Sequence, residues 1–222
     1  MLKWEKLPKE FQNDLVKPYY DILKKKKFSR FMVRLFDICA SSIPLLILLP
    51  FFLIIAIAIK VDSRGPVFYR QVRITRYNKE FRIFKFRTMV VNADKVGALV
   101  TTKNDNRITK VGNFLRKTKL DELPQLINVL LGDMSFTGTR PEVRKYVNSY
   151  SSEMFATLLT RAGITSSASI KYKDEASLIE NANDVDGVYI NEILPSKMEY
   201  NLEDIKKYGL FYNICLIFKT IF

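Results

Sequence analysis

The residues best suited to chemistry are an acidic pair, Asp121-Glu122, followed by Leu123 and Pro124. Because proline is favoured in the first turn of a helix, this spacing predicts that the pair lies at a helix N-terminus. There, unpaired backbone N–H groups and the helix dipole stabilise anions and lower carboxylate pKa values. Ionised carboxylates suit nucleophilic attack or binding of one Mg²⁺, so both residues are candidates for catalysis and for metal ligation. Simple helix capping by Asp121, beside a dipole-favoured Glu122, is the structural alternative.

Basic residues lie on both sides of the acidic pair in the sequence. Arg140 follows it in a Gly-Thr-Arg-Pro-Glu turn at 138–142, where a guanidinium between glycine and proline can bind phosphate bidentately. The preceding cations are Arg107, Lys110, Arg116, Lys117 and Lys119. Carboxylates, Mg²⁺ and arginines are the groups that phosphoryl transfer uses, because that chemistry depends on positioning and charge neutralisation. The region 105–142 therefore predicts a site that handles phosphate.

The composition excludes several other chemistries. The chain has 222 residues and no histidine, which rules out His-based acid–base catalysis, histidine-containing triads and zinc sites with histidine ligands. Cys39 and Cys215 lie in apolar stretches and predict buried free thiols rather than a disulfide. No GxGxxG or GxxxxGK[ST] motif is present, which argues against dinucleotide and P-loop sites. The formal net charge of +13 favours a partner rich in phosphate or anionic lipid.

One uncharged apolar segment, residues 38–59, stands apart from the rest of the chain. Its 22 residues would make about 33 Å of helix, close to the roughly 30 Å hydrocarbon core of a bilayer. Basic residues flank both ends, and a straight span cannot keep both ends on the cytoplasmic side. Pro44 and Pro50 can kink the helix, and Ser41 and Ser42 can bond the carbonyls that the prolines free. We therefore favour a re-entrant helix over a straight span; a buried helix of a soluble protein is the remaining alternative.

These features predict three parts in a mainly α fold. Residues 1–34 form a basic polar leader that anchors to the membrane surface, 35–60 form the re-entrant membrane helix, and 61–222 form a compact cytosolic catalytic domain with surface amphipathic helices. Alternation over 67–74 and 80–86 predicts a short β-hairpin. Helical spacing predicts helices over 111–116 and 123–131, an apolar helical stripe over 147–159, and a last helix over 202–222.

The ordered motifs of the chain resemble a known family. They are RLFDI, GPVFYRQVR, FRIFKFRTM, DNRITKVGNFLRKTKLDELPQL, NVLLGDMSFTGTRPE and AGIT. Over about residues 30–222 the sequence resembles the bacterial sugar transferases of the monotopic phosphoglycosyl transferase family. The resemblance implies transfer of a phosphosugar from a UDP-sugar to undecaprenyl phosphate with release of UMP, at the cytoplasmic face of the bacterial inner membrane, as the first membrane step of surface-glycan assembly.

The resemblance also implies roles for individual residues. Asp121 would be the nucleophile that forms a covalent phosphosugar intermediate, Glu122 would assist with Mg²⁺, and Arg140 would bind phosphate. Two positions depart from the family pattern: Leu49 replaces a serine before Pro50, and Thr139 replaces the first proline of the phosphate turn. Because Arg140 is retained in the phosphate turn, we expect the chain to be enzymatically active. Further substrate-phosphate positions implied by the family motifs are Lys85, Arg87, Asp105, Arg107 and Arg116.

Two other functional classes fit parts of the sequence. A non-catalytic scaffold tethered to the membrane would explain the apolar segment and the positive charge, but gives no reason for an acidic pair near Arg140. Nucleic-acid binding would explain basic residues interleaved with aromatics, but the chain has no groove-reading motif and the apolar segment would have no role. We therefore expect a UDP-sugar, undecaprenyl phosphate and an anionic bilayer as partners, and no nucleic acid. A homodimer, the particular sugar and the glycan pathway stay open.

Overall fold

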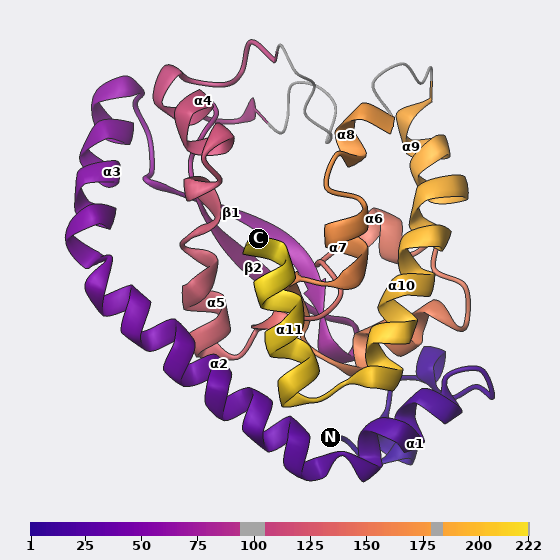
Figure 1. Ribbon diagram of the computed structural model, residues 1–222. Coiled ribbons are helices and arrows are strands. Elements are labelled where there is room, and N and C mark those ends of the chain that lie inside the picture. Colours follow the sequence, from indigo (N-terminus) through magenta and orange to yellow (C-terminus); the bar gives the residue numbers. More distant parts are fainter. Residues whose placement is uncertain (94–104, 179–183, 222) are drawn as a thin grey trace.

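Helices predominate in the computed structural model, which describes residues 1–93, 105–178 and 184–221. In this part of the chain the strands form two two-stranded sheets. A long bent pair of helices runs along one side of the molecule. Helices of the C-terminal half lie on the side opposite the second helix of this pair (Figure 1). The predicted class, mainly helical with a short hairpin, is confirmed.

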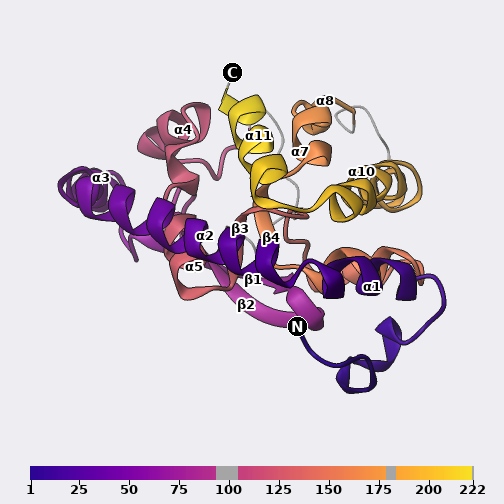
Figure 2. The same ribbon diagram turned by 60° about the horizontal axis from the view of Figure 1, so that its bottom comes forward.

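The apolar segment forms two helices, α2 (Lys27–Ile47) and α3 (Leu49–Asp62), which are bent by 63°. Among the described residues no single helix is both long and apolar enough to cross a bilayer, whereas this bent pair together is. Pro44 lies inside α2 and Pro50 lies in the first turn of α3. Both views place α3 at the edge of the molecule (Figures 1 and 2). This geometry is consistent with the expected re-entrant helix.

The serines before the bend do not act as expected. Ser41 donates its hydroxyl to the carbonyl of Asp37 at 2.6 Å, and Ser42 donates to the carbonyl of Ile38 at 2.8 Å. Neither bonds the carbonyl four residues before Pro44, which is the one that a proline leaves without its usual donor. The prediction that they satisfy this carbonyl is therefore wrong, because each serine reaches back three or four residues from its own position.

The predicted hairpin is confirmed as strands β1 (Phe68–Thr75) and β2 (Lys79–Phe86). Their antiparallel register runs from Phe68 opposite Phe86 to Thr75 opposite Lys79. The connection Arg76–Asn78 contains two residues with positive φ, Tyr77 at 61° and Asn78 at 60°. The hairpin carries Lys85 on its second strand, close to the end that precedes Arg87.

The acidic pair lies between two short helices, α4 (Lys110–Lys117) and α5 (Gln125–Leu131). Both helices were predicted; α5 begins later than expected because Leu120–Glu122 form a 3₁₀ turn. Thr109 caps α4 by accepting a hydrogen bond from the N–H of Gly112. Gly112 leaves no room for a Cβ, which would lie 2.0 Å from the carbonyl oxygen of Thr88. This contact fixes α4 against the chain that leaves β2.

A parallel pair of strands, β3 (Met134–Thr137) and β4 (Ala162–Thr165), was not predicted. Gly138 and Gly163 let the two chains approach closely after β3, since a Cβ on Gly163 would lie 2.2 Å from the N of Gly138. α5 contacts β2 and β3, and α2 packs against α5 and β3. The acidic pair is therefore attached to elements that also contact the bent helix pair.

The N-terminal residues pack into the largest hydrophobic core. Phe11, Val16 and Leu23 are fully buried there, together with residues of α10 (Leu194–Lys207). Leu23 belongs to α1 (Lys17–Lys25), which contacts α10. The segment that we expected to be a separate polar leader therefore shares its core with the C-terminal half of the chain.

Two predicted helices are divided in the structure. The apolar stripe over 147–159 belongs to a short helix, α6 (Arg144–Val147), and a 3₁₀ turn, Met154–Leu159. The last helix is divided into α10 and α11 (Leu210–Ile221) around Gly209. Apolar spacing alone did not reveal these breaks. The remaining elements are 3₁₀ turns at Trp4–Lys6 and Lys9–Phe11, helices α7 (Ser167–Lys171), α8 (Glu175–Leu178) and α9 (Val185–Val188), and a π-helical turn at Tyr189–Ile193.

The two cysteines are free but exposed, on α2 and α11. The prediction that Cys39 and Cys215 are buried thiols is therefore wrong. Each lies on an apolar helix with a face that the rest of the described chain leaves uncovered, so apolar neighbours in the sequence did not imply burial within the protein.

Candidate active site

Glu122 lies between two cations that come from distant parts of the chain. Lys85 Nζ on β2 and Arg140 Nη2, which follows β3, both lie 2.8 Å from Glu122 Oε1. The Lys85 and Glu122 side chains are about one-fifth exposed, whereas the Arg140 side chain is 44% exposed. The hairpin, the 3₁₀ turn and the 138–142 turn therefore meet at one carboxylate, and Arg140 is the member most open to a ligand.

The two neighbouring carboxyl groups have opposite pKa shifts. Burial opposes ionisation of Glu122, but Arg140 and Lys85 overcome it and hold the pKa of Glu122 well below its ordinary value. Burial raises the pKa of Asp121, and the positive charge of Lys85 only partly offsets this. The expectation that both pKa values are lowered is thus wrong for Asp121, because burial outweighs the nearby cations. Glu122 is ionised and paired, while Asp121 is a poorly solvated carboxyl group.

Asparagine 128 attaches the acidic turn to the hairpin. Its side chain accepts a hydrogen bond from the N–H of Phe84 at 2.8 Å and donates one to the carbonyl of Arg82 at 3.0 Å. Because Asn128 is fully buried, its amide cannot bond water, and these two hydrogen bonds satisfy it instead. They hold α5 against β2, so that the turn before α5 meets Lys85.

The turn that carries Arg140 is fixed from both sides by residues that the sequence analysis did not single out. Arg73 Nη1 donates to the carbonyl of Pro141 at 3.1 Å. Glu142 is buried and accepts a hydrogen bond from the Tyr189 hydroxyl at 2.6 Å, with Lys197 Nζ at 3.7 Å. Glu142 could have been recognised from the sequence, because it ends the Thr-Arg-Pro-Glu motif that contains Arg140.

Three further predicted residues are Asp105, Arg107 and Arg116. Arg107 and Asp105 pair with each other, with Arg107 Nη2 2.5 Å from Asp105 Oδ2. Hydrogen bonds from Arg107 lower the pKa of Asp105 to about 2, and the charge of Arg116 contributes to the same shift. Arg116 lies on α4, which contacts the turn of the acidic pair, and its positive charge partly opposes the rise in the pKa of Asp121. Asp105 and Arg107 are bonded to each other.

Arg87 makes its hydrogen bonds to the end of α3. Its guanidinium donates to the carbonyl of Ser63 at 2.6 Å and to the carbonyl of Arg64 at 3.1 Å. Gly65, with φ of 128°, leaves the space that Arg87 Nη1 occupies. Arg87 is 4% exposed and its bonds cap a helix, so the geometry gives it no contact with the acidic pair.

No group of three or more metal-ligating Cys, Asp or Glu residues occurs in 1–93, 105–178 and 184–221. Asp121 and Glu122 offer two adjacent carboxylates, and Mg²⁺ is commonly held in proteins by one or two carboxylates together with substrate phosphates. Glu122 Oε1 is already engaged by Lys85 and Arg140, whereas no hydrogen bond to the Asp121 carboxylate occurs among these residues. Asp121 is therefore the member of the pair whose carboxylate is open to a magnesium ion that arrives with a phosphate ligand.

The chain is similar to known proteins over most of its length. The family model described as "Bacterial sugar transferase" matches residues 28–222. The chain is 40% identical over 195 residues to a Klebsiella pneumoniae protein named UDP-glucose:undecaprenyl-phosphate glucose-1-phosphate transferase, covering 85% of this chain and 39% of that protein. It is 36% identical over 212 residues to an Escherichia coli (strain K12) protein of the same name, covering 93% of this chain and 43% of that protein.

A relative of more similar length is also found. The exopolysaccharide production protein ExoY of Rhizobium meliloti (strain 1021) is 32% identical over 203 residues, with 85% of this chain and 83% of that protein covered. The chain thus spans less than half of the two larger transferases but most of ExoY. All three matches include most of the residues that build the site.

Proposed function

This chain belongs to the bacterial sugar transferase family, and we propose that it transfers a sugar 1-phosphate from a UDP-sugar to undecaprenyl phosphate. The products are undecaprenyl diphosphate-sugar and UMP, and the reaction starts assembly of a surface glycan. The observation that carries the proposal is the meeting of Asp121-Glu122 with Lys85 and Arg140, because this places carboxylates and phosphate-binding cations at one point. The names of the two larger relatives describe the same reaction class with UDP-glucose as donor.

In the proposed first step, an Asp121 carboxylate oxygen attacks the phosphorus that carries the sugar. A bond forms between that oxygen and phosphorus while the bond to the bridging oxygen breaks, and UMP leaves with the electron pair. In the second step a phosphate oxygen of undecaprenyl phosphate attacks the same phosphorus and releases Asp121. The burial that raises the pKa of Asp121 also removes solvent from its oxygens, which favours their use as a nucleophile once ionised.

The cations take the role of holding the diphosphate. Arg140 presents a half-exposed guanidinium whose planar geometry suits two phosphate oxygens. Glu122 orients Arg140 and Lys85 before the substrate arrives, so little reorganisation is needed during the reaction. Arg116 adds positive charge on the Asp121 side.

We propose Mg²⁺ as the cofactor, held by Asp121 and Glu122 together with phosphate oxygens of the donor. When bound it would supply neutralisation of the negative charge on the diphosphate. The role of this chain's residues is to offer the carboxylates and to keep the neighbouring cations in place.

We place the protein at the cytoplasmic face of the bacterial plasma membrane, with α2 and α3 entering and leaving by one leaflet. The bend supports this placement, and so does an apolar surface that the protein itself does not cover. Both flanks of the pair are basic, as expected for segments on the cytoplasmic side. The exposed apolar residues around the bend are Ile43, Leu46, Ile47, Leu49, Phe51, Leu53, Ile54 and Ile57.

The test is release of UMP from a panel of UDP-sugars, with undecaprenyl phosphate as acceptor and protein in nanodiscs. We expect Asp121→Asn to abolish UMP release while membrane association is unchanged. The matched control is Asp14→Asn, which removes the charge of an exposed aspartate and should leave the rate unchanged. Full activity of Asp121→Asn would overturn the nucleophile assignment, and wild-type protein that releases UMP from no donor in the panel would favour the membrane-tethered scaffold.

A further inference from the structure

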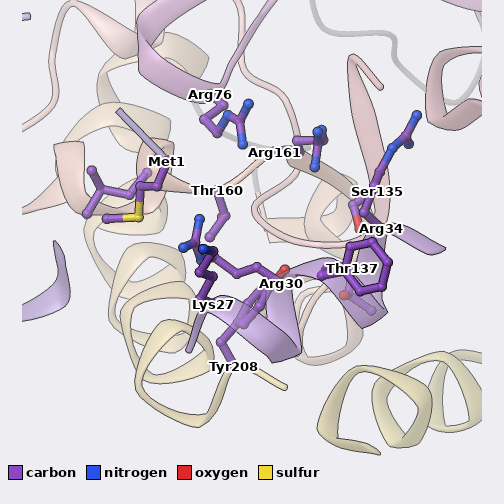
Figure 3. A pocket seen from close by; sticks show the side chains of 12 residues that line it. Met1, Lys27, Arg30, Arg34, Arg76, Ser135, Thr137, Thr160, Arg161 and Tyr208 are labelled. Atoms are coloured by element: carbon purple, nitrogen blue, oxygen red, sulfur yellow. The ribbon is translucent and has the colours of Figure 1, made fainter. Parts of the chain in front are cut away.

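A cavity of about 270 Å³ lies between the start of α2, the strand β3 and the segment 159–161 that precedes β4. Five basic side chains from three separate parts of the chain line it (Figure 3). Arg76 and Arg161 lie on one side, and Lys27 and Arg30 lie across from them. The five are Lys27, Arg30, Arg34, Arg76 and Arg161, and the hydroxyl groups of Ser135, Thr137, Thr160 and Tyr208 also line the cavity.

The positive charge of this cavity is largely uncompensated. None of the five cations takes part in a salt bridge within residues 1–93, 105–178 and 184–221. The Asp37 carboxyl group, which is 1% exposed and accepts hydrogen bonds from Ser135 and from the N–H of Phe136, acts on Arg34 and Arg161. Asp37 therefore compensates only part of this positive charge.

The like charges influence one another directly. Burial lowers the pKa of Arg161, and the positive charges of Arg76 and Arg34 lower it further. The Nε of Arg30 is buried and has no hydrogen-bond partner in the described chain. Such a cluster is costly when empty, because the cations repel one another and a donor is left unused, and an anion in the cavity would relieve both effects.

The cavity is separate from the acidic pair. Arg34 donates to the carbonyls of Val129 and Leu130 at the C-terminal end of α5, at 2.6 and 2.8 Å. The acidic turn lies before the N-terminal end of the same helix, whose length from Gln125 to Leu131 corresponds to about 10 Å. An anion held by Arg30, Arg76 and Arg161 would therefore not be the diphosphate at Arg140.

The surface next to the cavity indicates where its ligand comes from. Phe28, Phe31 and Leu35 on α2 are exposed by 76%, 64% and 44%. They follow helical spacing on one side of α2, next to the positions of Lys27, Arg30 and Arg34. A cationic cavity beside an exposed apolar stripe matches a molecule with a phosphate head and an acyl chain.

We propose that this cavity binds the phosphate of an anionic phospholipid headgroup, with the acyl chains along the exposed apolar face of α2. The proposal depends on the membrane placement of α2 given under the proposed function, but not on the chemistry at Asp121. Bound lipid would connect the start of α2 to the segment before β4 through Arg30 and Arg161. The lipid would thereby fix the angle at which the bent pair leaves the rest of the protein.

The test is the thermal unfolding of the full chain in neutral detergent with added short-chain lipids. We expect phosphatidylglycerol to raise Tm by about 5 °C at a concentration near a hundred times its Kd, and phosphatidylcholine to give little change. In Arg30→Gln/Arg76→Gln the phosphatidylglycerol shift should fall below about 1 °C. Without lipid this variant should unfold at the wild-type temperature or higher, because like-charge repulsion is relieved; a merely structural role for these arginines would lower it.

Three controls separate the alternatives. Lys9→Gln/Lys79→Gln removes the same charge from exposed positions outside the cavity and should keep the full shift. Asp121→Asn should also keep it, so that loss of the proposed catalysis and loss of lipid binding are distinguished. Inorganic phosphate or glycerol 1-phosphate giving the same rise as phosphatidylglycerol would overturn the lipid assignment, as would an equal shift in the Arg30→Gln/Arg76→Gln variant.

Discussion

Glu122 Oε1 lies 2.8 Å from Arg140 Nη2, which joins the turn before α5 to the turn after β3. The same oxygen also accepts from Lys85, so removing the charge of Glu122 affects two cations at once. We expect Glu122→Gln to reduce kcat/KM for the UDP-sugar by about 100-fold, because the cations that hold the diphosphate lose their orientation. We also expect a loss of about 2 kcal/mol in the free energy of unfolding, less than for a fully buried pair since the side chains are partly exposed. Steady-state kinetics and denaturant unfolding measure the two effects; kinetics equal to wild type would contradict the role of Glu122.

The lowered pKa of Glu122 predicts how stability depends on acid. Its folded-state pKa lies below its ordinary value of 4.5, so the ionised form stabilises the fold above pH 4.5. That contribution is lost as the pH falls from 4.5 through the folded-state pKa. Between about pH 5 and pH 3 the wild type should therefore lose more stability than Glu122→Gln, whose amide does not titrate. Parallel pH dependence of Tm in the two proteins would contradict the ion pairing.

The pKa of Asp121 is shifted in the opposite direction, so we expect its effect on stability to have the opposite dependence on pH. Its folded-state pKa is raised above 3.8, so its contribution to stability is present below that pH and is lost as the pH rises through the folded-state value. At neutral pH the ionised Asp121 carboxylate therefore destabilises the folded state. We expect Asp121→Asn to raise Tm by about 1–3 °C while UMP release disappears. A lower Tm would show that Asp121 is retained for structure rather than for chemistry.

Arg87 offers a test between a phosphate contact and a helix cap. Its bonds to the carbonyls of Ser63 and Arg64 require a forked group, which a lysine cannot supply. We expect Arg87→Lys to lower the free energy of unfolding by about 2 kcal/mol and leave KM for the UDP-sugar within about twofold of wild type. A rise of tenfold or more in KM with unchanged stability would instead support the phosphate contact that the family resemblance implies.

The sequence indicated the members of the proposed site but not the residues and elements that support them. Asp121 and Arg140 were found because unusual residues lie close together in the chain, and the hairpin was found from its alternation. The bonds of Arg87 to the end of α3 were not predictable, because they depend on how the end of β2 meets that helix. β3 and β4 have four residues each, too few for alternation to be recognised. Breaks such as that at Gly209 interrupt helices without changing the apolar spacing around them.

The re-entrant arrangement proposed for α2 and α3 predicts that both flanks of the pair lie on one side of the membrane. Lys24 precedes α2 and Lys79 lies on the hairpin after α3, and both are exposed. In a background with Cys39→Ser and Cys215→Ser, we expect neither Lys24→Cys nor Lys79→Cys to react with an impermeant thiol reagent added to intact bacteria. Both should react after permeabilisation, which is the control for accessibility. Labelling of one position alone in intact cells would show that the segment crosses the bilayer, and labelling of both would place the acidic pair on the outside, away from cytoplasmic UDP-sugars.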